Sequence, residues 1–89
     1  MKHLAIHVSG RVQGVFFRAS TKEKADALRL RGFVRNEPDG SVYIEAEGAA
    51  ETLDQFVAWC KQGPPLAVVN RVTINENPVK NFSDFIIQR

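Results

Sequence analysis

The chain has 89 residues, of which 44% are hydrophobic and 25% charged, and its formal net charge is +2. This length predicts one domain over residues 1–89. The single cysteine excludes an internal disulfide. No stretch approaches the roughly 18 apolar residues of a membrane span. The N-terminal segment lacks a long apolar region, so we expect no signal peptide and a cytoplasmic location. The small positive charge favours an anionic ligand over a cationic one, but it is too small to indicate nucleic-acid binding by itself.

The first segment, residues 3–8, alternates between apolar and other side chains. Leu4, Ile6 and Val8 share one face, and this period of two predicts a strand with one buried face. His3 and His7 fall on the opposite face, where we expect two polar residues on an open sheet surface. They lie about 13 Å apart along a strand, so no metal site is expected there.

Residues 17–31 change to helical spacing. Phe17, Thr21, Ala25 and Leu28 recur every three or four residues among charged ones, which predicts an amphipathic helix ending before Gly32. A second helix is predicted over residues 50–62 and ends before Gly63. Its apolar face holds four residues: Leu53, Phe56, Val57 and Cys60.

Between the helices, the sequence predicts a hairpin. The segment 33–36 is followed by Glu37-Pro38-Asp39-Gly40, where proline and glycine suit the second and fourth positions of a type I turn. Residues 41–48 then alternate, with Val42, Ile44 and Ala46 on one face and Ser41, Tyr43, Glu45 and Glu47 on the other. Two further strands are expected at residues 67–76 and 82–89.

The element order is therefore strand, helix, strand, strand, helix, strand, with an extra terminal strand. Two right-handed crossovers place both helices on one face of a mostly antiparallel sheet. This is an α+β sandwich of the ferredoxin-like type, with the expected strand order 4-1-3-2 and the fifth strand at an edge. The first two strands are then parallel, so the loop after the first should lie near Asn36 at the end of the second.

That loop, GRVQGVFFR at residues 10–18, joins a strand to a helix N-terminus. Gly10 and Gly14 allow the backbone to curl so that several N–H groups point into one concavity, and the helix dipole adds positive potential there. Arg18 offers a planar fork of donors suited to two phosphoryl oxygens. We expect the loop to be pinned to the core by its apolar residues: Val12, Val15, Phe16 and Phe17.

Simpler interpretations exist for each residue. Arg18 could be a solvated residue at the start of a helix, and Asn36 could be an asparagine that ends a strand before a turn. Arg11 could be solvated, or it could raise the local concentration of anionic substrates. Glu37 and Asp39 flank the turn, and the residue preferences of turns are enough to explain their presence.

Taken together, GRVQGVFFR and GFVRNEPDGSVYIEAEG (residues 32–48) resemble the paired signature motifs of the acylphosphatase family, and length and element order also fit. The resemblance implies hydrolysis of an acyl phosphate to a carboxylate and inorganic phosphate, without metal or organic cofactor. It implies that Asn36 orients the attacking water and that the phosphoryl oxygens are held by Arg18 together with the amides of Gly10, Arg11, Val12, Gln13, Gly14, Val15, Phe16 and Phe17. A water-holding asparagine amide is not a base near neutral pH, and the family-level proposal is that the substrate's own oxygens accept the proton.

The expected partners are a small acyl phosphate and inorganic phosphate, the latter as product and competitive inhibitor; a monomer is expected, with no nucleic acid or membrane partner. Two other classes of protein share parts of this pattern. RGFVRN resembles the start of an RNA-recognition motif, but Tyr43 is the only aromatic residue on the two strands that stack bases in such a module, and Glu45 and Glu47 would repel a phosphate backbone. A non-catalytic phosphate-binding domain of the same fold is the alternative, although simple phosphate binding needs no water-orienting amide.

Overall fold

The computed structural model describes all 89 residues as one five-stranded sheet with two helices. The strands are β1 (Lys2–Arg11), β2 (Arg31–Asn36), β3 (Val42–Gly48), β4 (Val68–Asn77) and β5 (Phe85–Ile87), and the helices are α1 (Phe17–Ala27) and α2 (Ala50–Cys60). The sheet order is β4-β1-β3-β2-β5. This confirms the predicted order, including a fifth strand at an edge.

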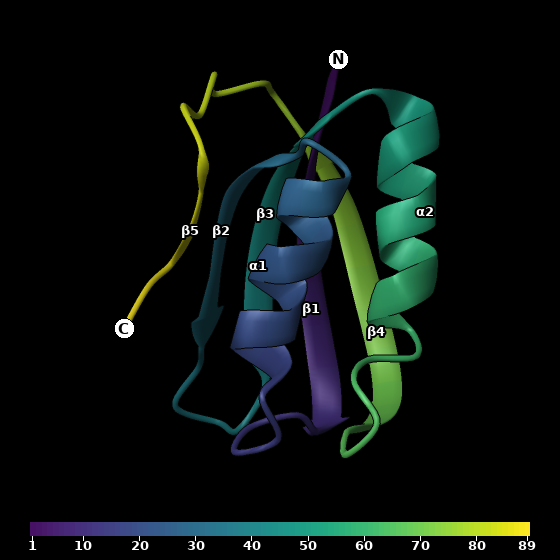
Figure 1. Cartoon of the computed structure of the whole chain (residues 1–89), viewed down its shortest axis with the longest axis vertical. Helices are drawn as coiled ribbons and strands as arrows, with labels where there is room; N and C mark the ends of the chain where they lie inside the picture. The colour runs from purple at the N-terminus through teal and green to yellow at the C-terminus, as the bar shows by residue number, and fades with distance from the viewer.

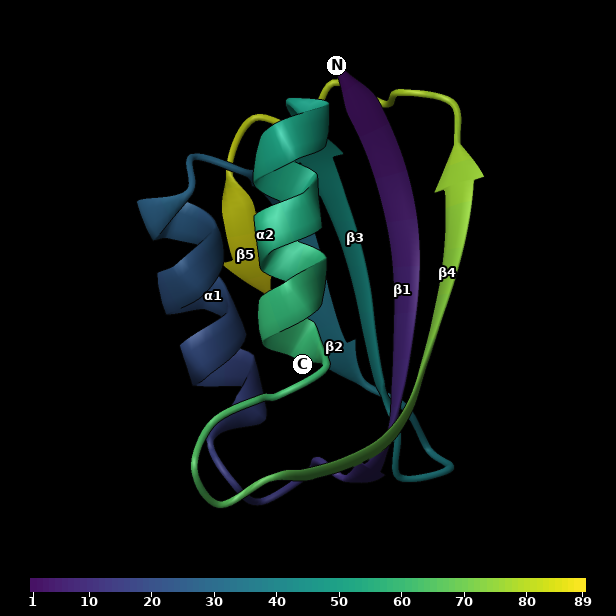
Figure 2. The same ribbon diagram turned by 90° about the vertical axis from the view of Figure 1, so that its right-hand side faces the viewer.

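Both helices cover the same face of the sheet, as Figures 1 and 2 show from two sides. β3 pairs antiparallel with both β1 and β2, so β1 and β2 are parallel and their C-terminal ends meet at one edge. β5 adds to the sheet parallel to β2, with Val34 opposite Ile87. The chain therefore has the ferredoxin-like fold, and the β1–α1 loop lies at the same edge as the end of β2.

The hydrophobic core lies between the sheet and the helices. Alternate strand residues enter it as predicted, because side chains on a strand point to opposite faces; Ile6, Val8, Val42, Ile44 and Ala46 are all buried. α2 contributes three fully buried residues, which lie on the predicted face: Leu53, Phe56 and Cys60. The predicted turn also forms, with the Gly40 amide donating to the Glu37 carbonyl at 3.1 Å.

The predicted end of the first helix is wrong. α1 ends at Ala27, and Arg29 adopts φ 58° in the left-handed region usually taken by glycine after a helix. Arg31 and Gly32 belong to β2 instead. The charged run continues the helical pattern past the true end, so periodicity alone placed the end too far along the chain.

The prediction that the sheet face opposite the helices is open to solvent is also wrong where the start of β1 pairs with the end of β3. His3 is fully buried there, as is Glu47, because residues 78–84 between β4 and β5 pass over them. The ring of Phe82 stacks on His3 with ring centroids 5.7 Å apart. This connection has no sequence periodicity that would have revealed that it covers the sheet.

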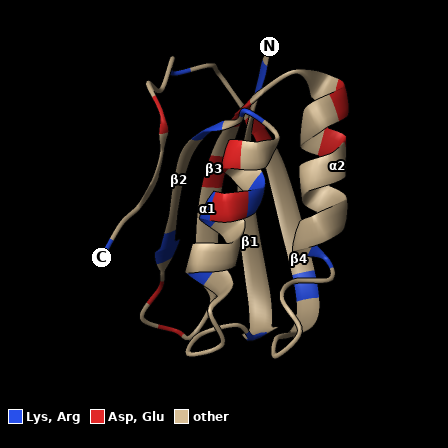
Figure 3. Cartoon of the chain, in the orientation of Figure 1, with Lys and Arg blue, Asp and Glu red and all other residues tan.

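Charged residues are spread over the molecule. Figure 3 shows Lys and Arg on α1, on strands and on connections, whereas the charged residues of α2 are acidic. No helix is long and apolar enough to cross a membrane. No group of three His, Cys, Asp or Glu side chains is placed to hold a metal ion.

Candidate active site

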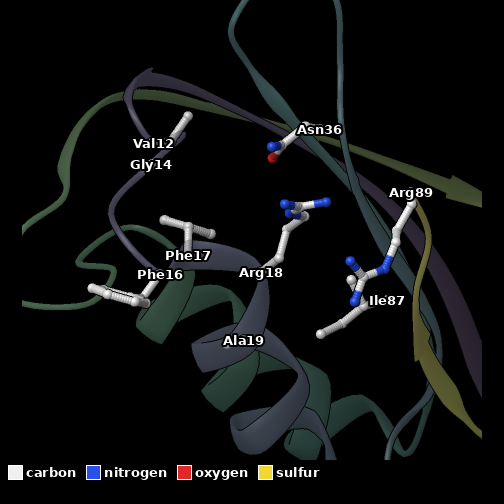
Figure 4. A pocket seen from close by; sticks show the side chains of 9 residues that line it. All are labelled: Val12, Gly14, Phe16, Phe17, Arg18, Ala19, Asn36, Ile87 and Arg89. Atoms are coloured by element: carbon white, nitrogen blue, oxygen red, sulfur yellow. The ribbon is translucent and has the colours of Figure 1, made fainter.

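A cavity of about 330 Å³ opens where the β1–α1 loop (residues 12–16) meets the ends of β2 and β5 (Figure 4). Its size is within the range of small-molecule sites. The loop and the start of α1 form one wall, and β2 and β5 form the other. Nine residues line it: Val12, Gly14, Phe16, Phe17, Arg18, Ala19, Asn36, Ile87 and Arg89.

The loop and the first residue of α1 are anchored to the core by three apolar side chains. Val12, Val15 and Phe17 are 1%, 8% and 2% exposed. Phe16 was expected to be a fourth anchor, and that expectation is wrong because its side chain is 73% exposed. Phe16 is the residue before α1 and has φ 65°, a left-handed conformation in which its side chain turns outward. Three anchors hold the backbone that faces the cavity.

The loop presents free backbone donors. None of the N–H groups of residues 12–16 donates to another backbone group or to a side chain, and α1 has no side-chain cap. The first amides of a helix have no partner within the helix, and the helix dipole makes this end positive. Unpaired amides at the positive end of a helix are the kind of group that binds anions in proteins.

Arg18 is the second residue of α1, and Figure 4 shows its side chain extending toward Asn36. It forms no ion pair with any carboxylate of the chain. The guanidinium is thus free to bind an anion held by the loop. Two oxygens of a phosphoryl group match the spacing of its donors.

Asn36 ends β2 and faces the same cavity (Figure 4). Its side-chain oxygen Oδ1 is buried and has no hydrogen-bond partner in the chain. No other buried side-chain nitrogen or oxygen atom lacks a partner. Buried polar atoms are nearly always hydrogen-bonded, and an exception calls for a ligand or a water. The amide of Asn36 is therefore free to hold a small polar molecule next to Arg18.

Gln13 connects the two walls of the site. Its side-chain amide donates to the carbonyl of Glu37 at 2.8 Å and to that of Ser41 at 2.9 Å. Both acceptors belong to the turn that follows Asn36. The bonds therefore fix the β1–α1 loop relative to the strand end that carries Asn36.

The two acidic residues of that turn are engaged outside the cavity. The Glu37 carboxylate accepts from Arg35 Nε at 3.1 Å. The Asp39 carboxylate accepts from the hydroxyl and the backbone amide of Ser41, and these two hydrogen bonds hold the pKa of Asp39 below its ordinary value. The Asp39 side chain therefore stabilises the turn, as the simpler interpretation had it, whereas the Glu37 side chain is held by Arg35 of β2.

The structure brings together Arg18, Asn36 and part of the predicted loop at the cavity. Among the other predicted loop residues, Gly10 and Arg11 end β1, the Gln13 side chain is bound to the turn, and Val15 is buried in the core; none of these four lines the cavity. Three lining residues were not predicted: Ala19, Ile87 and Arg89. Only the pairing of β5 with β2 identifies the last two, and the sequence gives no direct signal of that register.

Comparisons with known proteins identify the family of the chain. A sequence model of the acylphosphatase family matches residues 4–87. A curated acylphosphatase of Methylococcus capsulatus is 49% identical, with 100% of this chain and 98% of the relative covered, and one of Archaeoglobus fulgidus is 48% identical, with 92% of each covered. The crystal structure of the Bacillus subtilis acylphosphatase superposes with a TM-score of 0.97 at 38% identity and covers both chains fully. The fold, the family model and these relatives lead to one conclusion: the chain belongs to the acylphosphatase family, the enzymes that hydrolyse acyl phosphates to a carboxylate and inorganic phosphate.

Proposed function

We propose that, in the hydrolysis of acyl phosphates by this chain, Arg18 and the amides of residues 12–16 bind the phosphoryl group while Asn36 orients the attacking water. The observation that carries the proposal is the buried Asn36 Oδ1, which has no partner in the chain and faces the cavity that Arg18 enters (Figure 4). A water that donates to this oxygen would satisfy it. The proposed roles match those that the family resemblance implies for the same residues.

The chemistry suits such a sparse site. The water oxygen forms a bond to phosphorus, the bond from phosphorus to the acyl oxygen breaks, and the carboxylate leaves with its electron pair. Phosphoryl transfer depends mainly on positioning and on stabilising charge on the equatorial oxygens, and a carboxylate leaves without a strong general acid. The side chains of the nine lining residues include no carboxylate, imidazole or thiol, so no lining side chain acts as a general base and the proton of the water passes to a phosphoryl oxygen.

A monomer is proposed as the active form. The proposal is supported by the meeting of the β1–α1 loop, Arg18 and Asn36 at one cavity within a single copy of the chain. Light scattering at assay concentration would test this, and an obligate dimer would contradict it.

The decisive experiment measures hydrolysis of benzoyl phosphate in the presence of EDTA by the wild type and by Arg18→Ala and Asn36→Ala. We expect wild-type turnover to survive chelation. Loss of Arg18 removes donors from developing charge and should cost at least ~3 kcal/mol of transition-state stabilisation, or about 100-fold in kcat/KM. Asn36→Ala should lower kcat strongly with little change in the inhibition constant of inorganic phosphate.

Two outcomes would contradict these roles. An equal loss of kcat and of phosphate affinity in Asn36→Ala would show that this residue binds phosphate rather than orienting water. A wild type that binds phosphate but releases none from benzoyl phosphate would favour the alternative, a non-catalytic phosphate-binding domain of the same fold.

A further inference from the structure

A second guanidinium, that of Arg89, shares the cavity with Arg18. Val34 pairs with Ile87 in the parallel β2–β5 ladder, and the Gln88 amide donates to the Val34 carbonyl at 2.9 Å. β5 ends at Ile87, and because parallel strands advance in step, the chain beyond it continues toward the end of β2, where Arg89 and Asn36 line the same cavity. Figure 4 shows the Arg89 side chain running from β5 toward Ile87, with its guanidinium turned to the cavity.

No acidic side chain neutralises the two guanidinium groups. Neither Arg18 nor Arg89 takes part in an ion pair, and the cavity lining includes no acidic residue. Two like charges in one cavity repel each other, and the repulsion is relieved when anionic groups bind. The loop amides, the start of α1 and Arg18 already supply the donors that one phosphoryl group requires, which leaves the positive charge of Arg89 for a second anion.

The geometry of the reaction indicates where that second anion would lie. In phosphoryl transfer the attacking and leaving oxygens lie roughly in line with phosphorus. If Asn36 holds the water, the acyl group lies on the side of the cavity away from Asn36. Figure 4 shows Ala19 and Ile87 on that side, with the Arg89 guanidinium beside Ile87. An acyl group there would contact the apolar Ile87 and extend toward Arg89.

We propose that Arg89 is a specificity-determining residue that binds an anionic group carried by the acyl portion of the substrate. The preferred substrates are then acyl phosphates with a second negative charge, such as a carboxylate, at the far end of the acyl group. The planar fork of an arginine pairs well with two oxygens of such a group. This inference rests on the proposed function, since it assumes that the phosphoryl group occupies the loop.

The test compares benzoyl phosphate with 3-carboxybenzoyl and 4-carboxybenzoyl phosphate, whose rigid rings prevent the added carboxylate from attacking its own acyl carbon. The enzymes are the wild type, Arg89→Gln, Arg89→Lys and the control Arg71→Gln, which removes one positive charge from the exposed strand β4 outside the cavity. All reactions are run at one ionic strength. The quantity measured is the ratio of kcat/KM for each carboxylated substrate to kcat/KM for benzoyl phosphate.

The wild type should favour at least one of the carboxylated substrates. Arg89→Gln should lower that ratio by about threefold to fivefold, the effect of a solvent-accessible ion pair. The ratio for Arg89→Lys should lie between those of the wild type and Arg89→Gln, and Arg71→Gln should keep the wild-type ratio. An unchanged ratio in Arg89→Gln would overturn the proposal. So would an equal loss on all three substrates, because Arg89 would then act on the shared phosphoryl group.

A binding experiment separates this inference from the proposed function. Benzylphosphonate and 4-carboxybenzylphosphonate have a carbon–phosphorus bond and are not hydrolysed, so calorimetric titration gives their Kd values without turnover. If Arg89→Gln weakens binding of the carboxylated compound selectively, Arg89 binds the second anion whether or not acyl phosphates are consumed. If the variant weakens both compounds equally or neither, the inference fails even for an active enzyme.

Discussion

His3 lies between Glu45 and Glu47, with its two ring nitrogens each 2.8 Å from a carboxylate oxygen, Nε2 from Glu45 and Nδ1 from Glu47. Only a ring with a proton on both nitrogens can donate to both acceptors. Glu47 also accepts the backbone amides of Lys80, Asn81 and Phe82. This buried cluster therefore ties residues 80–82, and with them the path to β5, to the centre of the sheet.

The first prediction concerns stability in acid. Burial alone raises the pKa of Glu47, but the amide of Lys80, the ring of His3 and the amide of Phe82 outweigh it and lower the pKa to about 2, from an ordinary value of 4.5. A carboxylate with a depressed pKa stabilises the fold above its unfolded pKa, and this contribution is lost as the pH falls from about 4.5 toward 2. Urea unfolding of the wild type should show that loss in this window.

Glu47→Gln is the matched variant for that measurement. The substitution removes the charged acceptor of the His3 ring and of the backbone amides of residues 80–82, while Glu45 still faces the ring, so the variant should be less stable by about 2 kcal/mol at pH 7. Its stability should also change less between pH 4.5 and 2 than that of the wild type. Parallel pH profiles for the two proteins would contradict the role assigned to Glu47.

Gln13→Ala should disconnect the two walls of the active site. It removes two hydrogen bonds to the turn after Asn36, each worth about 1 kcal/mol, so the variant should lose about 2 kcal/mol of stability. Because Asn36 is then less well placed relative to the loop, kcat should fall by more than the inhibition constant of phosphate rises. Gln62→Ala, at an exposed glutamine beyond α2, is the control and should match the wild type in both measurements.

Gly10→Ala should destabilise the fold more than Gly14→Ala. A Cβ at Gly10 would lie 2.2 Å from the Val68 carbonyl oxygen, at φ +130°, whereas a Cβ at Gly14 meets nothing within 4 Å. Gly14→Ala should therefore lower the free energy of unfolding only by the strain of a left-handed alanine, about 1 kcal/mol. Gly10→Ala should lower it further, because its Cβ also clashes with the backbone of β4. Denaturant midpoints for the two variants check this order, and equal midpoints would show that β1 and β4 separate easily at this point.

Cys60 should resist thiol reagents in the folded protein. It is fully buried on α2, and burial raises the pKa of its thiol to about 12. At pH 8 the native thiol is therefore protonated and inaccessible, and modification requires unfolding. The reaction with a chromogenic disulfide should be slow in buffer and fast in 6 M guanidinium chloride. A fast reaction in buffer would indicate frequent opening of α2.

The sequence by itself determined those elements whose signals are local. Alternation along β1 and β3, helical spacing along α2 and the Pro38–Gly40 turn all follow from side-chain direction and backbone preference, which neighbouring residues set. The order of the elements, with right-handed crossovers, then predicted the sheet and the meeting of the β1–α1 loop with Asn36. Arg18 and Asn36 could be named for this reason.

The tertiary structure alone decided what depends on contacts between distant segments. The burial of His3 follows from a connection, residues 78–84, that has no periodicity of its own. The outward turn of Phe16 follows from a single left-handed residue before α1. The arrival of Arg89 at the cavity depends on the register of a three-residue strand against β2. A local pattern specifies which face of an element is apolar, but not which distant segment covers that face or in what register it pairs, because those are set by packing in the folded chain.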